Sequence, residues 1–524
     1  MIKNLTRKNH ILRVLILAVL LAAGCQQVGQ QPAIKTGPAV DVLSAFSYTV
    51  SMEQPASHRF QVNLRCQLDA GEELELKMPA WSPGYYRILN FARQVENFKA
   101  QDENGRFLAW EKKDENTWKI KTGRARQLLV SYEVMASGQG VAESQLTEKR
   151  AYISPTSIFM FVPGKLDFPV QVTIKPYPGF GQISTGLEPV PGRPNTFYAE
   201  NFDILYDCPI YVGNQQVIKF EVSGLTYELV ADEAGEFNQA EIIQALKRLI
   251  ITATGIIGEV PYRRYVFLLM GPGRGGLEHR NSMAVFTVLP KPEDRRAFQG
   301  WLSFIAHEFF HLYNAKAIRP VALGPFDYEK ENRTDLLWLA EGGTVYYEYL
   351  ILRRAGFMTR DEFLERLSQL IEKVENSAGR KLESAAEASW RAWEEPFFGS
   401  ETTISYYDIG AILTMLLDLK IRHETGGQKS LDDLMRFLYQ AYYKEKRRGF
   451  TDEEFRTACE QIAGADLSEF FNYVTTTQPI DYDKYLGYVG LKLLVREENG
   501  RKRYSIAMRE EVDGQQLRLL MGWL

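Results

Sequence analysis

Hydrophobic and polar residues alternate in three separate runs of the first half of the chain, at residues 60–64, 128–132 and 170–174. A period of two is typical of a strand that buries one face, and Gly and Pro residues lie between the runs. Further along, the apolar period becomes helical at residues 241–254, and a continuous apolar run at 265–270 predicts a buried strand. The pattern therefore predicts an antiparallel β domain followed by an α/β unit.

The last third of the chain has a helical apolar period, for example at residues 405–422 and 431–443. We therefore predict a multidomain α+β fold, and a chain of 524 residues is long enough for several domains. The predicted parts are a signal peptide (1–24), a flexible tether (25–42), an N-terminal β domain (43–213), an α/β catalytic domain (214–357), a helical domain (358–482) and a short C-terminal segment (483–524).

The segment 306–311 places His307 and His311 four residues apart, with Glu308 directly after the first histidine. Residues four apart on a helix lie on one face, about 6 Å along the axis, so both imidazoles can reach one metal ion. A carboxylate at the position of Glu308 can accept a proton from water without being a ligand itself. This HExxH pattern predicts a metallopeptidase zinc site, and the alternative is a pair of core histidines.

A catalytic zinc ion usually has three protein ligands, and no histidine follows His311 closely enough to be the third. Glu341 is the next candidate, because it lies in a second apolar stretch that Thr334 can cap. Gly342 and Gly343 each cost about 1 kcal/mol relative to alanine inside a helix, so we expect another element to pack closely there. The alternative for Glu341 is a solvated helix residue.

Further blocks follow in order around these candidate ligands, and they are residues 313–320, 324–328, 337–342 and 346–347. Together with the HExxH segment they resemble the glycyl aminopeptidase family, which consists of gluzincins that commonly end in a PDZ domain. Residues 79–86, 91–93 and 114–118 resemble the N-terminal domain of that family. The resemblance implies a thermolysin-like catalytic domain, one zinc ion per chain, and peptide substrates that lose small N-terminal residues such as Gly or Ala.

The glycine-rich block 271–279 follows the predicted strand at 265–270. It could be a phosphate loop, but the Gly-Lys-Ser/Thr sequence of a P-loop is absent. In related aminopeptidase N enzymes the equivalent block lies along the substrate backbone, and its glutamate holds the free α-amine. The resemblance therefore implies that Gly276 and Glu278 bind substrate, whereas without it Glu278 would be a surface-loop residue.

Two aromatic blocks, at residues 405–410 and 81–84, are further candidates for the site. Related gluzincins place a tyrosine hydroxyl against the oxyanion in a Tyr-x-Lys-Gly pattern, which Tyr407 matches except that Ile409 replaces the lysine. Tyr406 is the second candidate for this role, and core packing is the alternative for Tyr407. The block 81–84 (Trp-Ser-Pro-Gly) predicts a structural turn, and the resemblance implies that it lies near the cleft as a wall.

At the start of the chain, four basic residues precede an apolar run at residues 14–23 that is too short to span a bilayer. The run ends at Ala22-Ala23-Gly24-Cys25, which resembles a bacterial lipobox. We therefore predict lipid on Cys25 and an extracytoplasmic, membrane-anchored protein of the bacterial cell envelope. The alternative is an ordinary signal peptide that leaves Cys25 free.

Charge and cysteine content exclude several classes of protein. Loss of residues 1–24 would change the formal net charge from −4 to −8, which disfavours binding to nucleic-acid phosphates. Cys66, Cys208 and Cys459 lie far apart, so a disulfide framework is not expected. The remaining rivals are a zinc endopeptidase and an inactive peptide-binding scaffold, and the oligomeric state stays open. The thirty residues after Leu494 are too few for a PDZ domain, so 483–524 could be a PDZ remnant.

Overall fold

The computed structural model describes residues 45–524 apart from residues 69, 70, 72, 233, 234, 236, 272, 292, 395–398 and 401. The predicted signal peptide, the tether and Cys25 lie outside the described residues. Among the helices that are described, none is both long and apolar enough to cross a membrane.

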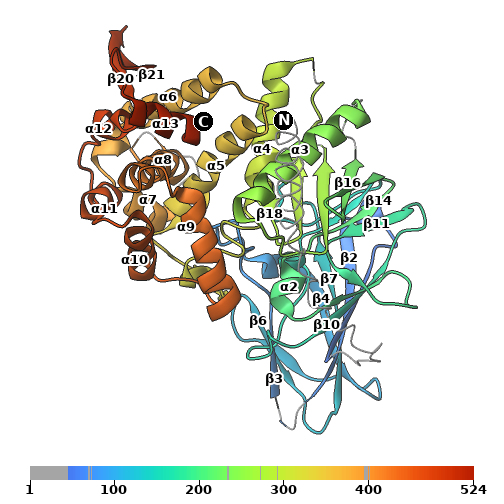
Figure 1. The fold of residues 1–524 in the computed structure, drawn as a ribbon. Coiled ribbons are helices and arrows are strands. Elements are labelled where there is room, and N and C mark those ends of the chain that lie inside the picture. The colour runs from blue at the N-terminus through green and yellow to red at the C-terminus, as the bar shows by residue number, and fades with distance from the viewer. Residues whose placement is uncertain are drawn as a thin grey trace, which may run out of the picture. The chain divides into compact units, whose positions relative to one another are not determined.

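A seven-stranded sheet forms the N-terminal β domain (Figure 1). Its strands lie in the order β12 (Glu188–Pro189), β13 (Thr196–Ala199), β10 (Val170–Lys175), β1 (Phe46–Ser51), β2 (Arg59–Gln67), β7 (Gln127–Met135) and β4 (Val95–Asp102). All neighbours pair antiparallel except β1 and β10, which are parallel. The alternation at residues 60–64 is confirmed, because Phe60, Val62 and Leu64 are buried while Gln61 and Asn63 are not.

Two smaller sheets belong to the same part of the chain. One has the order β11 (Gln182–Thr185), β14 (Ile210–Gly213), β9 (Ala151–Ile153) and β8 (Gln145–Leu146), and the other has the order β3 (Glu73–Lys77), β6 (Thr117–Lys121) and β5 (Trp110–Lys112).

The α/β unit is built on a mixed five-stranded sheet. Its order is β15 (Gln216–Val222), β16 (Leu225–Asp232), β17 (Arg264–Met270), β19 (Ser282–Phe286) and β18 (Gly276–Glu278). β16, β17 and β19 are parallel, and α3 (Gln239–Ile257) is the crossover from β16 to β17. The predicted helix at 241–254 and the predicted buried strand at 265–270 are thus confirmed. β18 is the antiparallel strand at the end of this order.

Helices make up most of the remaining chain, and in Figure 1 they gather apart from the blue and cyan strands. They include α4 (Arg295–Phe310), the π-helical turn η5 (Trp338–Gly342), α5 (Gly343–Arg354), α6 (Arg360–Glu375), α7 (Ala385–Trp390), α8 (Tyr406–Glu424), α9 (Leu431–Leu438), η8 (Tyr439–Lys446), α10 (Asp452–Ala463), α11 (Ser468–Thr475) and α12 (Tyr482–Gly487). Side-chain caps begin several of them, as Asp294 does for α4 and Ser405 for α8. An N-terminal β-sheet domain with a helical C-terminal part confirms the predicted α+β class.

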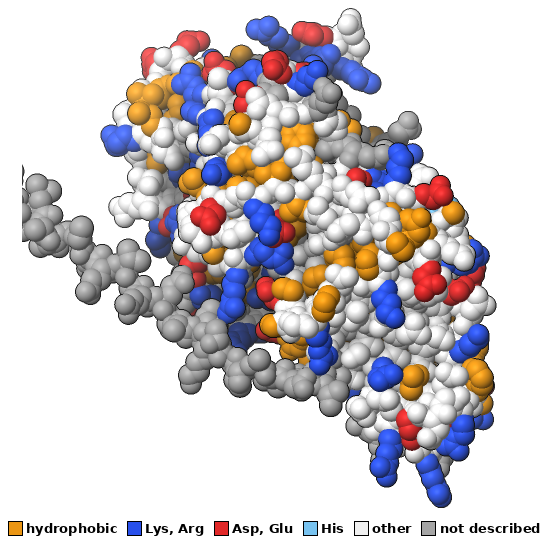
Figure 2. Space-filling model, turned by 90° about the vertical axis from the view of Figure 1, so that its right-hand side faces the viewer, with side chains coloured by type: hydrophobic (Ala, Val, Ile, Leu, Met, Phe, Trp, Pro, Cys, Tyr) orange, Lys and Arg blue, Asp and Glu red, His pale blue; other side chains and the backbone are white. Residues whose placement is uncertain are grey.

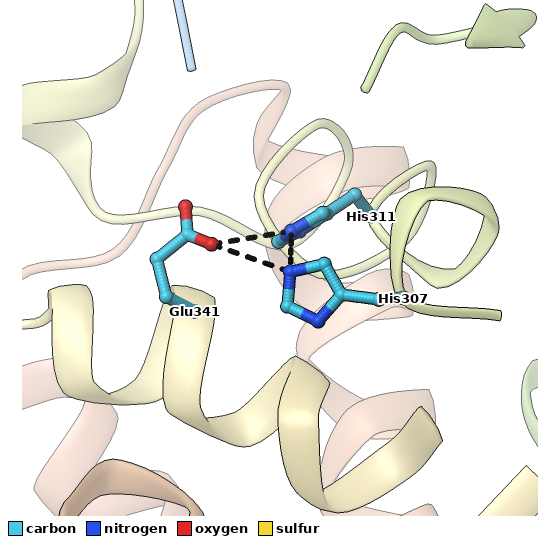
Figure 3. Close-up of side chains that lie close together, drawn as sticks. All are labelled: His307, His311 and Glu341. Carbon is cyan, nitrogen blue, oxygen red and sulfur yellow. Dashed lines mark hydrogen bonds and ion pairs between the residues drawn. The ribbon is translucent and has the colours of Figure 1, made fainter. Parts of the chain in front are cut away.

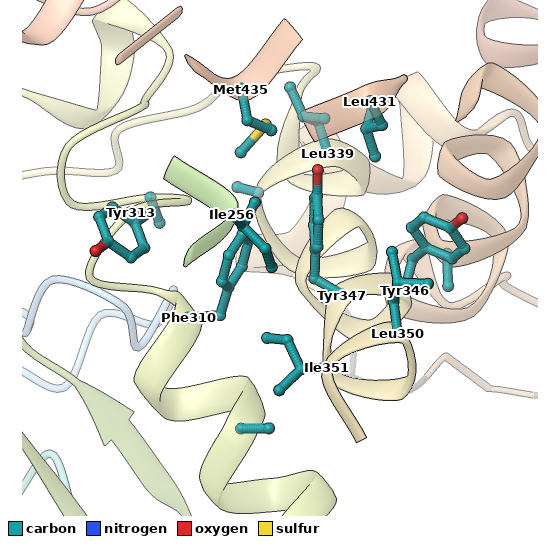
Figure 4. Packing of buried hydrophobic residues seen from close by; sticks show 14 of the residues in the cluster. Ile256, Phe310, Tyr313, Leu339, Tyr346, Tyr347, Leu350, Ile351, Leu431 and Met435 are labelled. Atoms are coloured by element: carbon teal, nitrogen blue, oxygen red, sulfur yellow. The ribbon is translucent and has the colours of Figure 1, made fainter. Parts of the chain in front are cut away.

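One hydrophobic core joins the α/β unit to the helices that follow it. Figure 4 shows part of this packing, where the ring of Phe310 on α4 stacks on Tyr347 of α5 with centroids 4.3 Å apart. The core continues into later helices through residues such as Phe363 and Leu416. The predicted domain boundaries stay predictions.

The C-terminal segment forms a hairpin and a helix: β20 (Leu491–Glu498), β21 (Arg501–Met508) and α13 (Gly514–Trp523). β21 packs on α6, where Ile506 N donates to Ser368 Oγ at 2.9 Å. The indole Nε1 of Trp523 donates to the hydroxyl of Tyr346 at 2.6 Å, which ties α13 to α5. On the surface shown in Figure 2, basic and acidic side chains are interspersed.

Two glycines allow an unusually close approach of α8 to η5. A Cβ atom on Gly410 would lie 2.1 Å from the carbonyl oxygen of Trp338, and one on Gly342 would lie 2.4 Å from Cα of Gly410. The expectation that an element packs closely against Gly342 is therefore confirmed. At Gly343 the nearest atom would be Nδ2 of Asn314, at 3.3 Å.

Gly410→Ala should destabilise the protein by about 1 to 3 kcal/mol, because the added methyl group has no space against the η5 backbone. Gly255→Ala in α3 is the matched control, since a Cβ atom there meets nothing within 4 Å; it should be neutral or stabilising by up to about 1 kcal/mol. Urea unfolding of both variants measures the difference. Equal stability of the two variants would show that the crossing is not tight.

Candidate metal centre and active site

The three residues predicted as metal ligands come together in the structure (Figure 3). His307 and His311 project from the end of α4, and Glu341 projects from η5. The Nε2 atoms of the two histidines are 3.0 Å apart, and Oε2 of Glu341 lies 3.2 Å from Nε2 of His311 and 3.7 Å from Nε2 of His307. A tetrahedral zinc ion with bonds of about 2.1 Å separates its ligands by roughly 3.4 Å, so this spacing fits the ion.

The remaining ring nitrogens of both histidines are already used. Nδ1 of His307 donates to Oε2 of Glu348 at 2.9 Å, and the other oxygen of that carboxylate accepts from Ser303 Oγ at 2.8 Å. Nδ1 of His311 donates to the carbonyl oxygen of Asn314 at 2.8 Å. Such bonds fix the tautomer that leaves the Nε2 lone pairs available to a metal ion. The donor set therefore fits zinc.

Asn314 holds the two ligand-bearing helices in register. Its side-chain Nδ2 donates to the carbonyl oxygens of Leu339 and Ala340, at 2.8 and 3.1 Å, and to Thr344 Oγ1 at 3.0 Å. One buried amide thus joins the loop that holds His311 to the turn that carries Glu341.

Glu341 lies within the π-helical turn, a local widening that is frequent at functional sites. The turn begins with two side-chain contacts: Leu336 N donates to Thr334 Oγ1 at 3.3 Å, and Trp338 N donates to Ser389 Oγ at 2.9 Å. The prediction that Thr334 caps this helix is wrong, because the cap position is Leu337, which makes no side-chain cap bond. Ser389 of α7 adds a contact that the local sequence does not indicate.

In the absence of a metal ion, the charges of this cluster stabilise one another. Burial acts to lower the pKa of both histidines, but hydrogen bonds and charges of Glu341 and, for His307, Glu348 raise it overall. Burial acts to raise the pKa of Glu341, but the histidines lower it overall. Protons and a metal ion compete for the same nitrogen and carboxylate atoms, so the affinity for the metal ion should depend on pH.

Glu308 lies beside the ligands with 5% of its surface exposed. Burial, as the largest cause, raises its pKa to about 7. A Cβ atom on Gly276 would lie 2.3 Å from Oε1 of Glu308, so the glycine lets β18 pass directly over this carboxylate. Gly276 therefore lies beside Glu308, and its predicted role in substrate binding stays a prediction.

Glu278 is buried, with 5% exposure, so the surface-loop alternative is wrong. Its Oε1 lies 3.4 Å from Nζ of Lys316, which also lies 3.0 Å from Oδ1 of Asp207. The same Oδ1 is 3.3 Å from Nδ1 of His279. Burial acts to lower the pKa of Lys316, but the two carboxylates raise it overall, so this ammonium is charged. We call Asp207, Glu278, His279 and Lys316 the amine cluster.

The turn at residues 81–86 is both a structural turn and a wall of the site. Tyr85 N donates to Ser82 O at 3.0 Å, which closes the turn. Gly84 has φ +91°, and a Cβ atom there would lie 2.5 Å from Oε1 of Glu278. Two residues later, the hydroxyl of Tyr86 donates to Oε1 of Glu341 at 3.0 Å. A loop of the β domain therefore contacts both candidate groups.

Of the two candidate tyrosines, Tyr407 contacts a metal ligand directly, whereas Tyr406 contacts Tyr407. The ring of Tyr407 stacks on that of His307 with centroids 6.1 Å apart, and Tyr406 packs behind it at 4.7 Å. Tyr406 is fully buried, whereas Tyr407 is half-buried. Burial and the charge of Glu341 raise the pKa of both phenols, so both remain protonated donors.

Sequence reasoning missed five residues of this site: Tyr86, Asp207, Asn314, Lys316 and Glu348. Glu348 could have been found, because it follows Glu341 by seven residues on the same helical face and metal-bound histidines usually have a carboxylate partner. Asn314 and Lys316 lie in a block that resembles the family. No local signal identifies Asp207.

Comparison with known families agrees with this geometry. One family model, the Peptidase M61 N-terminal domain, matches residues 47–214, and a second, M61 glycyl aminopeptidase, matches residues 300–413. The chain belongs to the M61 glycyl aminopeptidase family. Because this chain matches a peptidase family and also brings together a His-His-Glu group that can hold a metal ion, it is a metallopeptidase. No match was found among the curated proteins.

Solved structures resemble this M61 chain along most of its length. An aminopeptidase N family protein from Idiomarina loihiensis is 27% identical with a TM-score of 0.80, covering 86% of this chain and 79% of that one. An M1 zinc metallopeptidase from Deinococcus radiodurans is 13% identical with a TM-score of 0.52, covering 83% and 94%. Legionella pneumophila aminopeptidase A, in complex with aspartic acid, is 13% identical with a TM-score of 0.52, covering 90% and 56%. The last two show a shared fold.

Glu348→Gln should lower zinc affinity by about 10- to 100-fold, because the amide is a weaker acceptor for Nδ1 of His307. Glu365→Gln on α6 is the control for the same chemical change at an exposed site. Competition with a metal chelator measures both affinities. Unchanged affinity in Glu348→Gln would remove Glu348 from the metal site.

Proposed function

We propose that this M61 chain is a zinc aminopeptidase that releases small N-terminal residues from peptides. The observation that carries the proposal is the closeness of two buried groups: a His-His-Glu set beside Glu308, and an amine cluster in which Glu278 and Asp207 contact the same ammonium, that of Lys316. The nearer alternative is an endopeptidase with the same zinc chemistry. Small first residues such as Gly or Ala are suggested by the family resemblance.

The metal centre would hold one zinc ion per chain through His307, His311 and Glu341, in the gluzincin arrangement of a thermolysin-like domain. Bound zinc would polarise the scissile carbonyl and make water more acidic. Glu308 accepts the proton of the attacking water and then passes it to the leaving amine. Its burial supports this role, because a base with a pKa near neutrality can both take up and release a proton.

The amine cluster supports an exopeptidase over an endopeptidase. Asp207 and Glu278 are two carboxylates that share one ammonium, that of Lys316. A buried carboxylate is stabilised by a close cationic partner, and the charged α-amine of a peptide would supply one for Glu278, which lies 3.4 Å from the ammonium of Lys316. The neutral amide of an internal peptide bond would not. β18, which contains Gly276 and Glu278, ends the sheet order and could pair with an extended substrate backbone.

Tyr407 would donate its hydroxyl to the oxyanion of the tetrahedral intermediate. Tyr86 would instead hold the ligand Glu341 in place through its hydrogen bond. Tyr407→Phe should then lower kcat by roughly 10² to 10³ with little change in KM. Greater damage from Tyr406→Phe would assign the oxyanion contact to the neighbouring tyrosine.

Membrane anchoring is a separate part of the proposal and concerns Cys25, outside the described residues. The lipobox-like sequence at residues 22–25 supports lipid attachment to Cys25 and a place in the bacterial cell envelope, facing away from the cytoplasm. Membrane fractionation with mass spectrometry of the mature N-terminus tests it. Unmodified Cys25 on a protein recovered wholly in the soluble fraction would disprove the anchor.

Glu308→Gln should retain about one zinc ion per chain while turnover falls by about 10² to 10⁴, because the proton acceptor is lost and the ligands remain. Glu293→Gln, at an exposed position just before α4, is the control. Metal analysis and peptide hydrolysis are measured on the same samples. Loss of zinc together with activity would show that Glu308 is structural, and unchanged turnover would show that it is not the base.

N-acetylated peptides should be poor substrates of the wild-type enzyme, because acetylation removes the charge that completes the amine cluster. Glu278→Gln should reduce kcat/KM for free peptides by about tenfold or more, since a charge-assisted hydrogen bond contributes about 1.5 to 3 kcal/mol. The ratio of free to acetylated turnover measures the effect. Equal wild-type rates on both peptides would indicate an endopeptidase.

A further inference from the structure

A cavity of about 520 Å³ lies next to the amine cluster, and its walls are strongly basic. We call it the cationic pocket. Six basic side chains line it, namely those of Arg280, Lys316, Arg319, Lys444, Arg447 and Arg448. Only two acidic side chains, Asp203 and Asp207, stand among its lining residues. This excess of positive charge contrasts with the chain as a whole, whose formal net charge is −4.

Several of these cations already have carboxylate partners. Lys316 is held by the amine cluster, Lys444 pairs with Glu259 and Arg448 pairs with Glu454. Arg280, Arg319 and Arg447 differ, because no carboxylate among the described residues lies within ion-pair distance of their guanidinium groups. Asp203 and Asp207 act on Arg319 only through their charges at longer range, so they offset the positive charge of the pocket in part.

Arg319 is half-buried and is held in place by the loop at residues 324–328. A Cβ atom on Gly324 would lie 2.1 Å from Cζ of Arg319, and the guanidinium lies over the ring of Phe326 at 5.8 Å. The sequence blocks 313–320 and 324–328 thus meet at this guanidinium, which the proposed mechanism does not use. A largely desolvated cation without a carboxylate partner is costly, and an anionic ligand would offset that cost.

Only Lys316 separates the cationic pocket from Glu278, the proposed binding site of the α-amine. Lys316 lines the pocket and also lies 3.4 Å from Oε1 of Glu278. Pro83 lines it too, and the next residue, Gly84, packs directly against the Glu278 carboxylate. A peptide whose amino group pairs with Glu278 would therefore lie close to the cationic pocket.

We propose that the cationic pocket binds a carboxylate of the peptide substrate, with Arg319 and Arg447 as its main counter-charges. This rests on the proposed aminopeptidase function and narrows its substrate class to peptides with a suitably placed acid. The carboxylate has two possible sources, an acidic side chain near the amino end and the C-terminal carboxylate of a short peptide. Arginine suits both, because its guanidinium can bind a carboxylate with two parallel hydrogen bonds.

Matched peptide pairs distinguish the two sources. The side-chain arm compares Gly-Glu-Ala-amide with Gly-Gln-Ala-amide, which both keep a small first residue. The C-terminal arm compares Gly-Ala-Ala with Gly-Ala-Ala-amide. In at least one pair the zinc-loaded wild-type enzyme should prefer the acid by about tenfold in kcat/KM, as expected for a charge-assisted contact. Added salt should reduce the preference for the acidic peptide, because salt screens the charge of exposed cations such as Arg447.

Arg319→Gln should abolish this preference, and Arg447→Gln should reduce it. Arg447 is exposed, so its replacement keeps the test available if Arg319→Gln does not fold. Arg124→Gln is the control, because Arg124 is also exposed but does not line the pocket. Equal kcat/KM within every pair, or a preference that both pocket variants retain, would overturn the proposal.

Calorimetry on the zinc-loaded Glu308→Gln protein separates this proposal from the proposed function. The variant should bind the acidic member of the preferred pair about tenfold more tightly even without turnover. Preferential binding with no hydrolysis by the wild-type enzyme would refute the aminopeptidase and leave the carboxylate site standing. Hydrolysis of free peptides without any preference for the acidic member would refute the carboxylate site and support the aminopeptidase.

Discussion

Backbone meets backbone where α8 crosses the turn that carries Glu341, and the two glycines at the crossing leave no space for a methyl group. This close approach determines where the start of α8 lies, and so it brings the rings of Tyr406 and Tyr407 beside the metal ligands. Asn314 joins the same turn to the end of α4 from the other side. The positions of all three ligands and of the tyrosine pair thus follow from one tightly packed junction.

Buried charged side chains lie around that junction in two neighbouring groups. The His-His-Glu set beside Glu308 fits a metal ion, and Glu278 of the amine cluster is the residue that we propose binds the α-amine of a peptide. Because unpaired buried charges are costly, both groups favour the ligands that neutralise them. Gly276 and Gly84 allow the carboxylates to lie against the backbone of β18 and of the 81–86 turn. A bound peptide with a free amino end would contact both groups at once.

Local sequence patterns predicted the features that are local in the structure. The HExxH spacing brought His307 and His311 together, apolar periods located α3 and β17, and Gly342 indicated a close helix contact. Contacts between side chains that are far apart in the sequence could not be predicted from local patterns. Asp207 reaches Lys316 from another domain, and Tyr86 lies 255 residues from Glu341. The π-helical form of the turn at residues 338–342 has no local signature in the sequence, although Gly342 indicated that another element packs closely there.

Through the turn at residues 81–86, the N-terminal β domain also contributes residues to the active site. Its Gly84 and Tyr86 contact Glu278 and Glu341, while the helices that carry the metal ligands belong to the other domain. A substitution in this β-domain loop can therefore change which peptides fit without altering any metal ligand. Within the family, such loop variation offers an evolutionary route to new specificities in which the catalytic helices stay constant.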